Sequence, residues 1–308
     1  MDNIVHSNMD RHRELYKDIH IPKHSKYAAV IVEPRCHVYL EFVIKNATYF
    51  LPDWSLYIFH SKQNKDFVST ILGHNRDNVH MIEFCLDNIS IPEYNRLLTS
   101  PGFYKKFQNA KYILIFQTDS YICRFGIESY VSLDYDYIGA PWLYESYIYQ
   151  TGNGGLSLRK VKKMIEITEN IVWNGEAEDL YFNSALQHDG KIPNKFSTIA
   201  QSFSVESIFH PNPFGTHKTL YSLNIHFEKI DECIVIEAFW TCKRNKISVK
   251  ELIQQTLDTE KTIYSDIKHL GDPFPNVQKY LICTIRINGI EKKLTIEENK
   301  IIDVYQII

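Results

Sequence analysis

The stretch KYILIFQTDS, residues 111–120, decides the fold. Five apolar or aromatic residues, 112–116, are followed at once by the polar residues Gln117, Thr118, Asp119 and Ser120. A continuous apolar run of this length predicts a strand buried on both faces. In open α/β sheets ligands bind beyond the carboxyl ends of the strands, so Asp119 is a candidate ligand-binding residue. The alternative is that Asp119 and Ser120 only begin a turn.

The segments before this strand alternate between two patterns. Apolar runs at 27–32 (YAAVIV), 54–59 (WSLYIF) and 78–84 (NVHMIEF) predict three further strands. Between them, apolar residues recur at helical spacing over 36–50 and 60–73, and a short helix is expected at 103–107. Strands that alternate with helices predict a mostly parallel sheet with helices on both faces.

Two polar segments follow that suggest a binding site. The run GNGGLSLR, residues 152–159, lets backbone approach a ligand closely, although a β-bulge or tight turn explains the same glycines. The acidic cluster 176–179 begins a predicted helix, where carboxylates are also favoured by the helix dipole without any function. Two histidines, His210 and His217, lie in a loop-like segment that contains prolines and a glycine, which raises the case for a binding role, although most of the 13 histidines must be surface or core residues.

The pattern changes after about residue 220. Apolar or alternating runs at 233–240, 281–287, 290–296 and 301–307 predict strands, and Asn288-Gly289 predicts a type I′ hairpin turn. We therefore expect an N-terminal arm over 1–24, an α/β domain over 25–220 and a small β-rich accessory domain over 221–308. The accessory domain is expected to serve acceptor docking or homo-oligomer formation.

Composition excludes several classes of protein. With 308 residues, 44% of them hydrophobic, the chain has the composition of a globular protein with room for two domains. A net charge of −3 offers no basic surface for nucleic acid. We expect no secretory signal and no membrane span, because no apolar run is long enough, and therefore a cytoplasmic location. The six scattered cysteines, without a CxxC pair, are expected to be reduced.

Taken together and in order, these motifs resemble the DUF5672 family over residues 25–220. The resemblance rests on YAAVIVEPR, YNRLLTSPGFY, LIFQTDS, DYIGAPW, GNGGLSLR, EDLYF and PFGTHK. Members are similar to nucleotide-sugar-dependent glycosyltransferases of the GT-A fold, a Rossmann-like α/β architecture. Large DNA viruses are among their sources, so a viral member would act in the host cytoplasm or the virion.

The resemblance implies a divalent cation. In the GT-A fold a DxD motif at a strand end holds the cation against the donor diphosphate, and the matching positions here are Gln117, Thr118 and Asp119. The first carboxylate is therefore replaced by an amide. Asp119 and His217 are the implied metal ligands, and waters and phosphate oxygens would complete the shell. Imidazole favours Mn²⁺ over Mg²⁺.

The resemblance also implies roles for other residues. Asp179 in EDLYF matches the general base of inverting enzymes and is preferred over Glu178. Binding of the nucleotide-sugar donor, which we expect to be UDP-linked, is implied for the following positions: Glu33, Arg35, Asn95, Gln117, Thr118, Trp142, Asn153, Gly154 and Gly155. Glu33 and Arg35 could instead form a surface ion pair, and Trp142 and Asn153 could serve packing alone.

The sequence thus predicts a metal-dependent enzyme that transfers a hexose from a nucleotide sugar to a hydroxyl of a glycan, protein or small molecule, with inversion. A rival hypothesis is a non-catalytic nucleotide-sugar or glycan-binding module that has kept the fold, which the missing first carboxylate favours. A nucleotidyltransferase is a third hypothesis, but the chain has no GxxxxGK[ST] loop.

Overall fold

The computed structural model describes residues 2–142, 152–218, 225–242, 245–304 and 307. The chain divides into two compact units. The first comprises Met1–Cys123 and Asp134–Ile225, and the second comprises Arg124–Leu133 and His226–Ile308. The short segment 124–133, which the sequence assigned to the α/β domain, thus clusters with the accessory unit.

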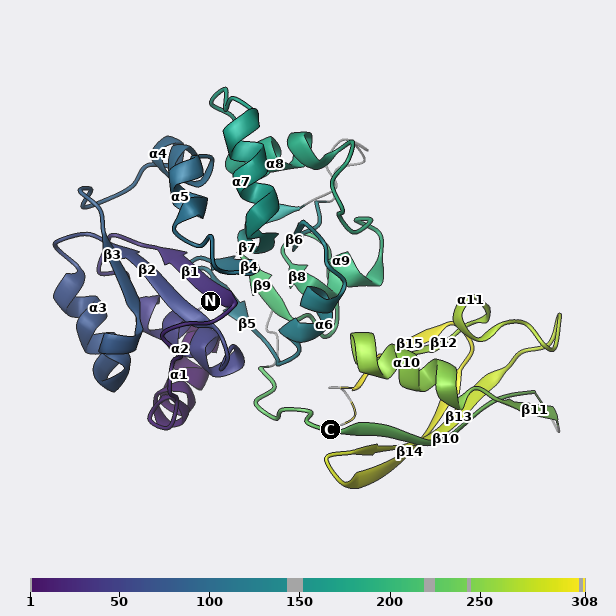
Figure 1. Cartoon of the computed structure of the whole chain (residues 1–308). Helices are drawn as coiled ribbons and strands as arrows, with labels where there is room; N and C mark the ends of the chain where they lie inside the picture. Colours follow the sequence, from purple (N-terminus) through teal and green to yellow (C-terminus); the bar gives the residue numbers. More distant parts are fainter. Residues whose placement is uncertain (1, 143–151, 219–224, 243–244, 305–306, 308) are drawn as a thin grey trace. The chain divides into compact units, whose positions relative to one another are not determined.

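The first unit is built on a six-stranded sheet with the order β3-β2-β1-β4-β7-β6 (Figure 1). Its strands are β1 Tyr27–Val32, β2 Ser55–His60, β3 His80–Glu83, β4 Tyr112–Phe116, β6 Tyr137–Ala140 and β7 Asn153–Lys160. The first four run parallel to one another, and β7 runs antiparallel to both of its neighbours. The predicted mostly parallel sheet is therefore confirmed.

Helices cover both faces of this sheet. In Figure 1, α1 Asp2–Tyr16, α2 Leu40–Phe50 and α3 Lys65–Leu72 lie on one side, and α3 continues into the 3₁₀ turn η1 Gly73–Asn78. The other side carries α4 Ile91–Leu98, α5 Pro101–Lys105, α7 Val161–Asn170 and α8 Glu178–Leu186. Because alternate residues of β4 face opposite helix layers, all five are buried.

A second, small sheet lies beyond the carboxyl end of β4. It contains β5 Ser120–Ile122, β9 Gly215–His217 and β8 Ser204–Val205, in the order β5-β9-β8. The short helix α9 Thr198–Phe203 leads into β8. Asn46 of α2 fixes this sheet, since its side chain accepts from Ile122 N at 2.7 Å and donates to Ile122 O at 2.9 Å. The antiparallel register places Ser120 opposite His217.

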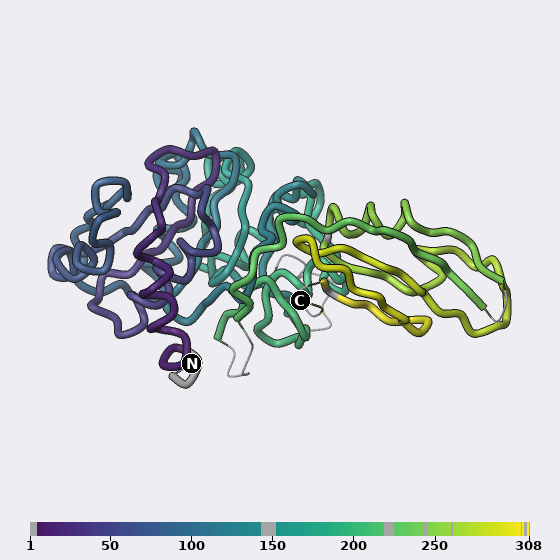
Figure 2. The backbone as a smooth tube through the Cα atoms, turned by 90° about the horizontal axis from the view of Figure 1, so that it is seen from below, coloured from purple at the N-terminus to yellow at the C-terminus, as the bar shows by residue number. Residues whose placement is uncertain are grey.

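The second unit is rich in β structure, as predicted. Its main sheet is antiparallel, with β10 Cys233–Cys242, β11 Asn245–Ser248, β13 Tyr280–Ile287 and β14 Ile290–Glu297 in the order β11-β10-β13-β14. In Figure 2 the backbone of this unit runs in long extended segments, coloured green to yellow. Asn288 and Gly289 have φ values of 46° and 83°, which confirms the predicted type I′ turn. The unit also contains α6 Ile127–Ser132, α10 Lys250–Glu260, β12 Thr262–Ser265, α11 Ile267–Leu270 and β15 Lys300–Asp303.

Two expectations from composition can be compared with the structure. Across the described ranges, no helix has the length and apolar character that crossing a membrane requires. None of the six cysteines, all of which lie in the described ranges, forms a disulfide.

Candidate functional site

The polar segment after β4 forms a tight turn that Ser120 stabilises. The Ser120 hydroxyl accepts a hydrogen bond from Gln117 N at 2.7 Å and lies 3.1 Å from the Gly155 carbonyl oxygen. Ser120 N donates to Gln117 O at 3.1 Å. The turn interpretation therefore holds for Ser120, whereas the side chain of Asp119 remains 40% exposed.

The structure brings Asp119 and His217 together, although 98 positions in the chain separate them. His217 Nε2 lies 3.4 Å from Asp119 Oδ1 and 3.2 Å from Gln117 Oε1. The cause is the β5–β9 pairing, reinforced by a hydrogen bond from Lys218 N to Asp119 O at 3.0 Å. The imidazole is buried, with 1% of its surface exposed. His210, the other histidine of this segment, accepts a hydrogen bond at Nδ1 from Asn212 N.

Charges around His217 determine its protonation. Burial alone would lower the pKa of His217, but hydrogen bonding and charge from Asp119 and Glu206 outweigh burial and raise that pKa above its ordinary value. Burial would raise the pKa of Asp119, but His217 outweighs it and holds that pKa below its ordinary value. The charged form of the imidazole is therefore stabilised by the two carboxylates, relative to a histidine in water.

The glycine-rich segment is not a loop but the strand β7, inside the sheet. A Cβ on Gly155 would lie 2.1 Å from His217 Nε2, and one on Gly154 would overlap Glu178 Oε1. Gly155 N donates to Asn153 Oδ1 at 2.7 Å. Glycine is thus required at these two positions because a larger residue would overlap side chains of the protein itself. The structure gives them a packing role, and donor contact by Asn153, Gly154 and Gly155 stays a prediction.

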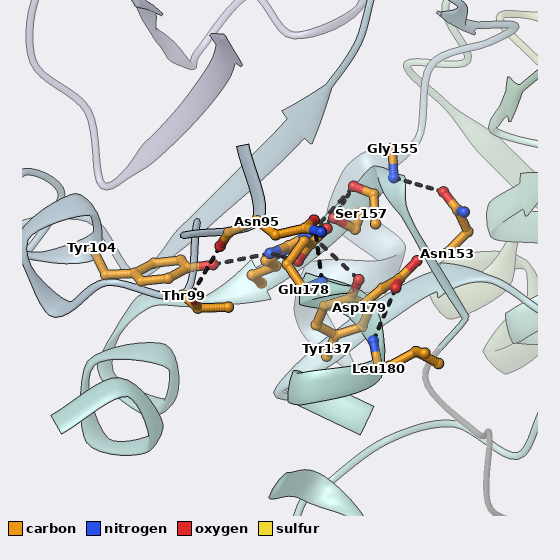
Figure 3. Close-up of polar contacts among 12 residues, drawn as sticks. Asn95, Thr99, Tyr104, Tyr137, Asn153, Gly155, Ser157, Glu178, Asp179 and Leu180 are labelled. Carbon is orange, nitrogen blue, oxygen red and sulfur yellow. Dashed lines mark hydrogen bonds and ion pairs between the residues drawn. The ribbon is translucent and has the colours of Figure 1, made fainter. Parts of the chain in front are cut away.

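Glu178 and Asn95 are parts of a buried polar network (Figure 3). Both oxygens of Glu178 bind the fully buried Arg159, at 2.8 and 3.0 Å, and Arg159 Nη1 also lies 2.9 Å from the Tyr104 hydroxyl. The amide oxygen of Asn95 accepts a hydrogen bond from Glu178 N at 3.3 Å. Glu178 is 5% exposed, so its carboxylate binds Arg159 and is not accessible to an acceptor substrate. Asn95 holds the first turn of α8 in place.

Asp179 is the neighbouring carboxylate and has a different environment. It is half-buried, and its Oδ1 accepts a hydrogen bond from Leu180 N at 2.9 Å (Figure 3). Burial, followed by the charge of Glu178, raises the pKa of Asp179 to about 6. A carboxylate with a pKa near neutrality can accept a proton from an acceptor hydroxyl, which is what a general base requires.

The polar end of β1 lies beside the polar end of β4, because the two strands are parallel neighbours. Glu33 accepts three hydrogen bonds from Arg35, one from its backbone N–H and two from its guanidinium, at 2.7–2.9 Å. The ion pair considered as the alternative is thus present. Glu33 is 4% exposed and Arg35 is half exposed, so only Arg35 can reach a ligand without rearrangement. The side chain of Asn64 holds this turn through the carbonyl oxygens of Glu33 and Arg35.

Two further predicted donor-binding residues have fewer described contacts. Thr118 is half-buried in the turn after β4, and Trp142 is half-buried after β6, directly before the segment 143–151 that lies outside the described residues. Their roles in donor binding stay predictions.

The pair Asp119 and His217 fits a divalent cation. Two adjacent ligands of an octahedral ion, each about 2.1 Å from the metal, are about 3 Å apart, which is close to the observed 3.4 Å. In the described ranges, no three His, Cys, Asp or Glu side chains form a group suited to a metal. A cation here would therefore take two protein ligands and need oxygen atoms from a bound diphosphate or water.

Sequence reasoning missed Arg159 and Glu206. Arg159 belongs to the quoted motif GNGGLSLR, but the polar neighbours Ser157 and Lys160 hid any sign that its charge is buried. Glu206 lies 3.7 Å from His217 Nδ1. It gave no signal, because the contact depends on the pairing of β8 with β9.

Comparison with solved structures finds partial similarities. Two structures of the glycosyltransferase GlyE from Streptococcus pneumoniae TIGR4 are similar in part. The apo form has 13% identity and a TM-score of 0.40 over 65% of this chain, and the other has 16% identity and 0.36 over 54%. This chain covers 57% and 44% of them, less than two thirds of their length.

A 4-diphosphocytidyl-2C-methyl-D-erythritol synthase from Anaerococcus prevotii DSM 20548 has 10% identity and a TM-score of 0.34, over 55% of this chain and 84% of its own. At these TM-scores the similarities do not decide the function. No curated protein sequence matches the chain. Residues 78–217, however, match the family described as "Protein of unknown function (DUF5672)", which confirms the family that the sequence motifs indicated.

Proposed function

We propose that this chain is a metal-dependent glycosyltransferase that uses a nucleotide-sugar donor, UDP-linked, and a hydroxyl acceptor. The observation that carries the proposal is the meeting of Asp119 and His217 beyond the carboxyl end of a parallel sheet, where open α/β folds bind ligands. A carboxylate and an imidazole at this spacing suit Mn²⁺, with Mg²⁺ as the second choice.

Asp119 and His217 would hold the cation, which stabilises the charge that develops on the diphosphate leaving group. The side-chain oxygen of Gln117 lies 3.2 Å from His217 Nε2. It would accept a hydrogen bond from a water molecule bound to the cation. Arg35 would bind the nucleotide through its exposed guanidinium, whose orientation is fixed by two hydrogen bonds to Glu33. Thr118, Trp142 and Asn153 would contact the sugar.

Asp179 would act as the general base. The acceptor oxygen forms a bond to the anomeric carbon, the bond from that carbon to the diphosphate oxygen breaks, and the acceptor proton passes to Asp179. Attack opposite the leaving group inverts the anomeric configuration. The raised pKa of Asp179 supports this assignment, because a stronger base removes the proton more readily. Glu178 would serve by holding the first turn of α8 through Arg159.

Hydrolysis and transfer assays with a panel of nucleotide sugars, with and without Mn²⁺, test the proposal. We expect one UDP-sugar to be consumed only with the metal, and Asp119→Ala to abolish that consumption. Asp77→Ala, which removes an exposed carboxylate elsewhere in the same unit, is the matched control. Absence of turnover with any donor, together with metal-dependent binding of UDP, would instead favour the non-catalytic module.

That second candidate has one specific observation in its favour. Gln117 occupies the position where the metal-binding motif has its first carboxylate, so the site has one negative charge fewer than that motif supplies. Gln117→Asp distinguishes the two hypotheses, because a second carboxylate would strengthen cation binding in either case but would raise turnover only in an enzyme.

A further inference from the structure

His217 lies between two carboxylates, and only one of them belongs to the proposed cation site. Its Nε2 lies 3.4 Å from Asp119 Oδ1, and its Nδ1 lies 3.7 Å from Glu206 Oε1. Glu206 directly follows β8, whose last residue, Val205, pairs with Thr216 of β9. The parallel register therefore places Glu206 level with His217.

The contact between His217 and Glu206 is buried. The imidazole is 1% exposed and the Glu206 side chain is 16% exposed. Within the part of the chain that the structure describes, neither His217 Nδ1 nor Glu206 Oε2 has a hydrogen-bond partner. A buried acceptor without a donor is costly, and an N–H on Nδ1 is the donor that faces Glu206. Lys218 is a weaker partner, since its Nζ lies 3.9 Å from Glu206 Oε1 and its side chain is mostly exposed.

The position of the histidine proton decides what the other nitrogen can do. A neutral imidazole carries one N–H and one lone pair. With the proton on Nδ1, the lone pair of Nε2 faces Asp119 Oδ1 and Gln117 Oε1. Three hydrogen-bond acceptors then face one another without a donor. Such a set repels itself unless a cation lies among the three atoms or Nε2 also takes up a proton. A carboxylate behind a metal-bound histidine is a common way to fix this arrangement.

We propose that Glu206 is a positioning residue that holds the proton of His217 on Nδ1 and thereby directs Nε2 at the divalent cation. The cation rests on the proposed function, whereas the tautomer of His217 can be measured without it. The imidazole ring packs against Gly155, which restricts its sideways movement. Glu206 therefore has to fix only the orientation of the ring and the nitrogen that carries the proton.

The test compares Glu206→Ala and Glu206→Gln with the wild-type chain. Glu166→Ala, which removes an exposed carboxylate of α7, is the matched control for the change in charge. Calorimetric titration of Mn²⁺ into the UDP-saturated protein should show affinity about 10- to 100-fold weaker for Glu206→Ala, with a smaller loss for Glu206→Gln, whose amide oxygen can still accept from Nδ1. Glu166→Ala should bind as the wild type does.

The second readout is the pair of ¹⁵N imidazole resonances of His217, recorded without metal at a pH well above the ordinary histidine range. We expect a larger share of the Nδ1–H tautomer in the wild type than in Glu206→Ala, because Glu206 is the acceptor that faces Nδ1. An unchanged tautomer and unchanged Mn²⁺ affinity in Glu206→Ala would overturn the inference. Failure of the wild type to bind Mn²⁺ would overturn the proposed function instead, and the tautomer would still decide the role of Glu206.

Discussion

Replacement of Gly155 by alanine tests the imidazole site with a single methyl group. The added Cβ would lie 2.1, 2.4 and 2.5 Å from Nε2, Cε1 and Cδ2 of His217. Atoms in ordinary contact are about 3.5 Å apart, so the ring must retreat by about 1.4 Å. Gly155 does not have a positive φ, and the backbone therefore accepts alanine without strain. The effect of the substitution falls on the imidazole.

The expected magnitudes follow from this displacement. A metal–nitrogen bond is about 2.1 Å long, and a retreat of about 1.4 Å breaks it. We expect Mn²⁺ affinity in the presence of UDP to fall at least about 10- to 100-fold, which corresponds to about 1.4–2.8 kcal/mol. Overpacking of the buried strand should lower the free energy of unfolding by about 1–3 kcal/mol.

Calorimetric titration of Mn²⁺ and urea unfolding give the two quantities separately. Gly102→Ala is the control, because a Cβ on Gly102 meets nothing within 4 Å and the residue lies in α5. Alanine there should leave Mn²⁺ affinity unchanged and stabilise the helix slightly. If Gly155→Ala lost stability as expected and yet bound Mn²⁺ as tightly as the wild type, His217 would not be a metal ligand and the proposed site would fall.

Three further predictions concern other parts of the chain. If Asp179 is the base, turnover should rise with pH through about 6, and Asp179→Asn should abolish turnover in a pH–rate profile. The fold raises this pKa above its unfolded value, so ionised Asp179 destabilises the protein. Asp179→Asn should therefore be more stable than the wild type, and thermal unfolding should show this difference growing as pH increases from about 4 to about 6. Glu178→Ala should lower the free energy of unfolding by about 3–5 kcal/mol, because the buried charge of Arg159 is left without its carboxylate partner, and a loss below about 1 kcal/mol in urea titration would contradict the buried pair. Gly289→Ala, at a φ of 83°, should cost about 1 kcal/mol of stability without changing Mn²⁺ affinity.

The parts of the fold that sequence predicted best are those with strong local signals. The predicted bounds of β1 and β4 match the structure, because strands buried on both faces are continuous apolar runs. The hairpin of β13 and β14 was also predicted correctly, since Asn288-Gly289 matches the backbone that a type I′ turn needs.

Failures arose where distant contacts decide the local structure. The strand β7 was interpreted as a turn, bulge or ligand-binding loop, because its glycines are unfavourable in strands. Those glycines make room for His217, Glu178 and Arg159, which the sequence alone does not place beside them. Helix α4 was missed although its signals are local, since Ser90 and Glu93 form a capping box at its start.

The candidate site shows the same division. Asp119 could be selected because it ends an apolar strand, and His217 because the family resemblance pointed to it. Their proximity follows from the β5–β9 register, which no local pattern encodes. Glu206 and Arg159 act through pairings of this kind and were therefore invisible as partners before the fold was known.

The assignment of residues 124–133 to the second unit has a practical consequence for the design of truncated fragments. Helix α6, whose Ile127, Tyr130 and Val131 are buried, packs with α10, which is made more than a hundred residues later in synthesis. A fragment that stops at residue 225 would carry α6 without α10 and expose those three apolar side chains to water. Such a truncation invites aggregation, and an expression plasmid for the first unit alone would need polar replacements at these three positions.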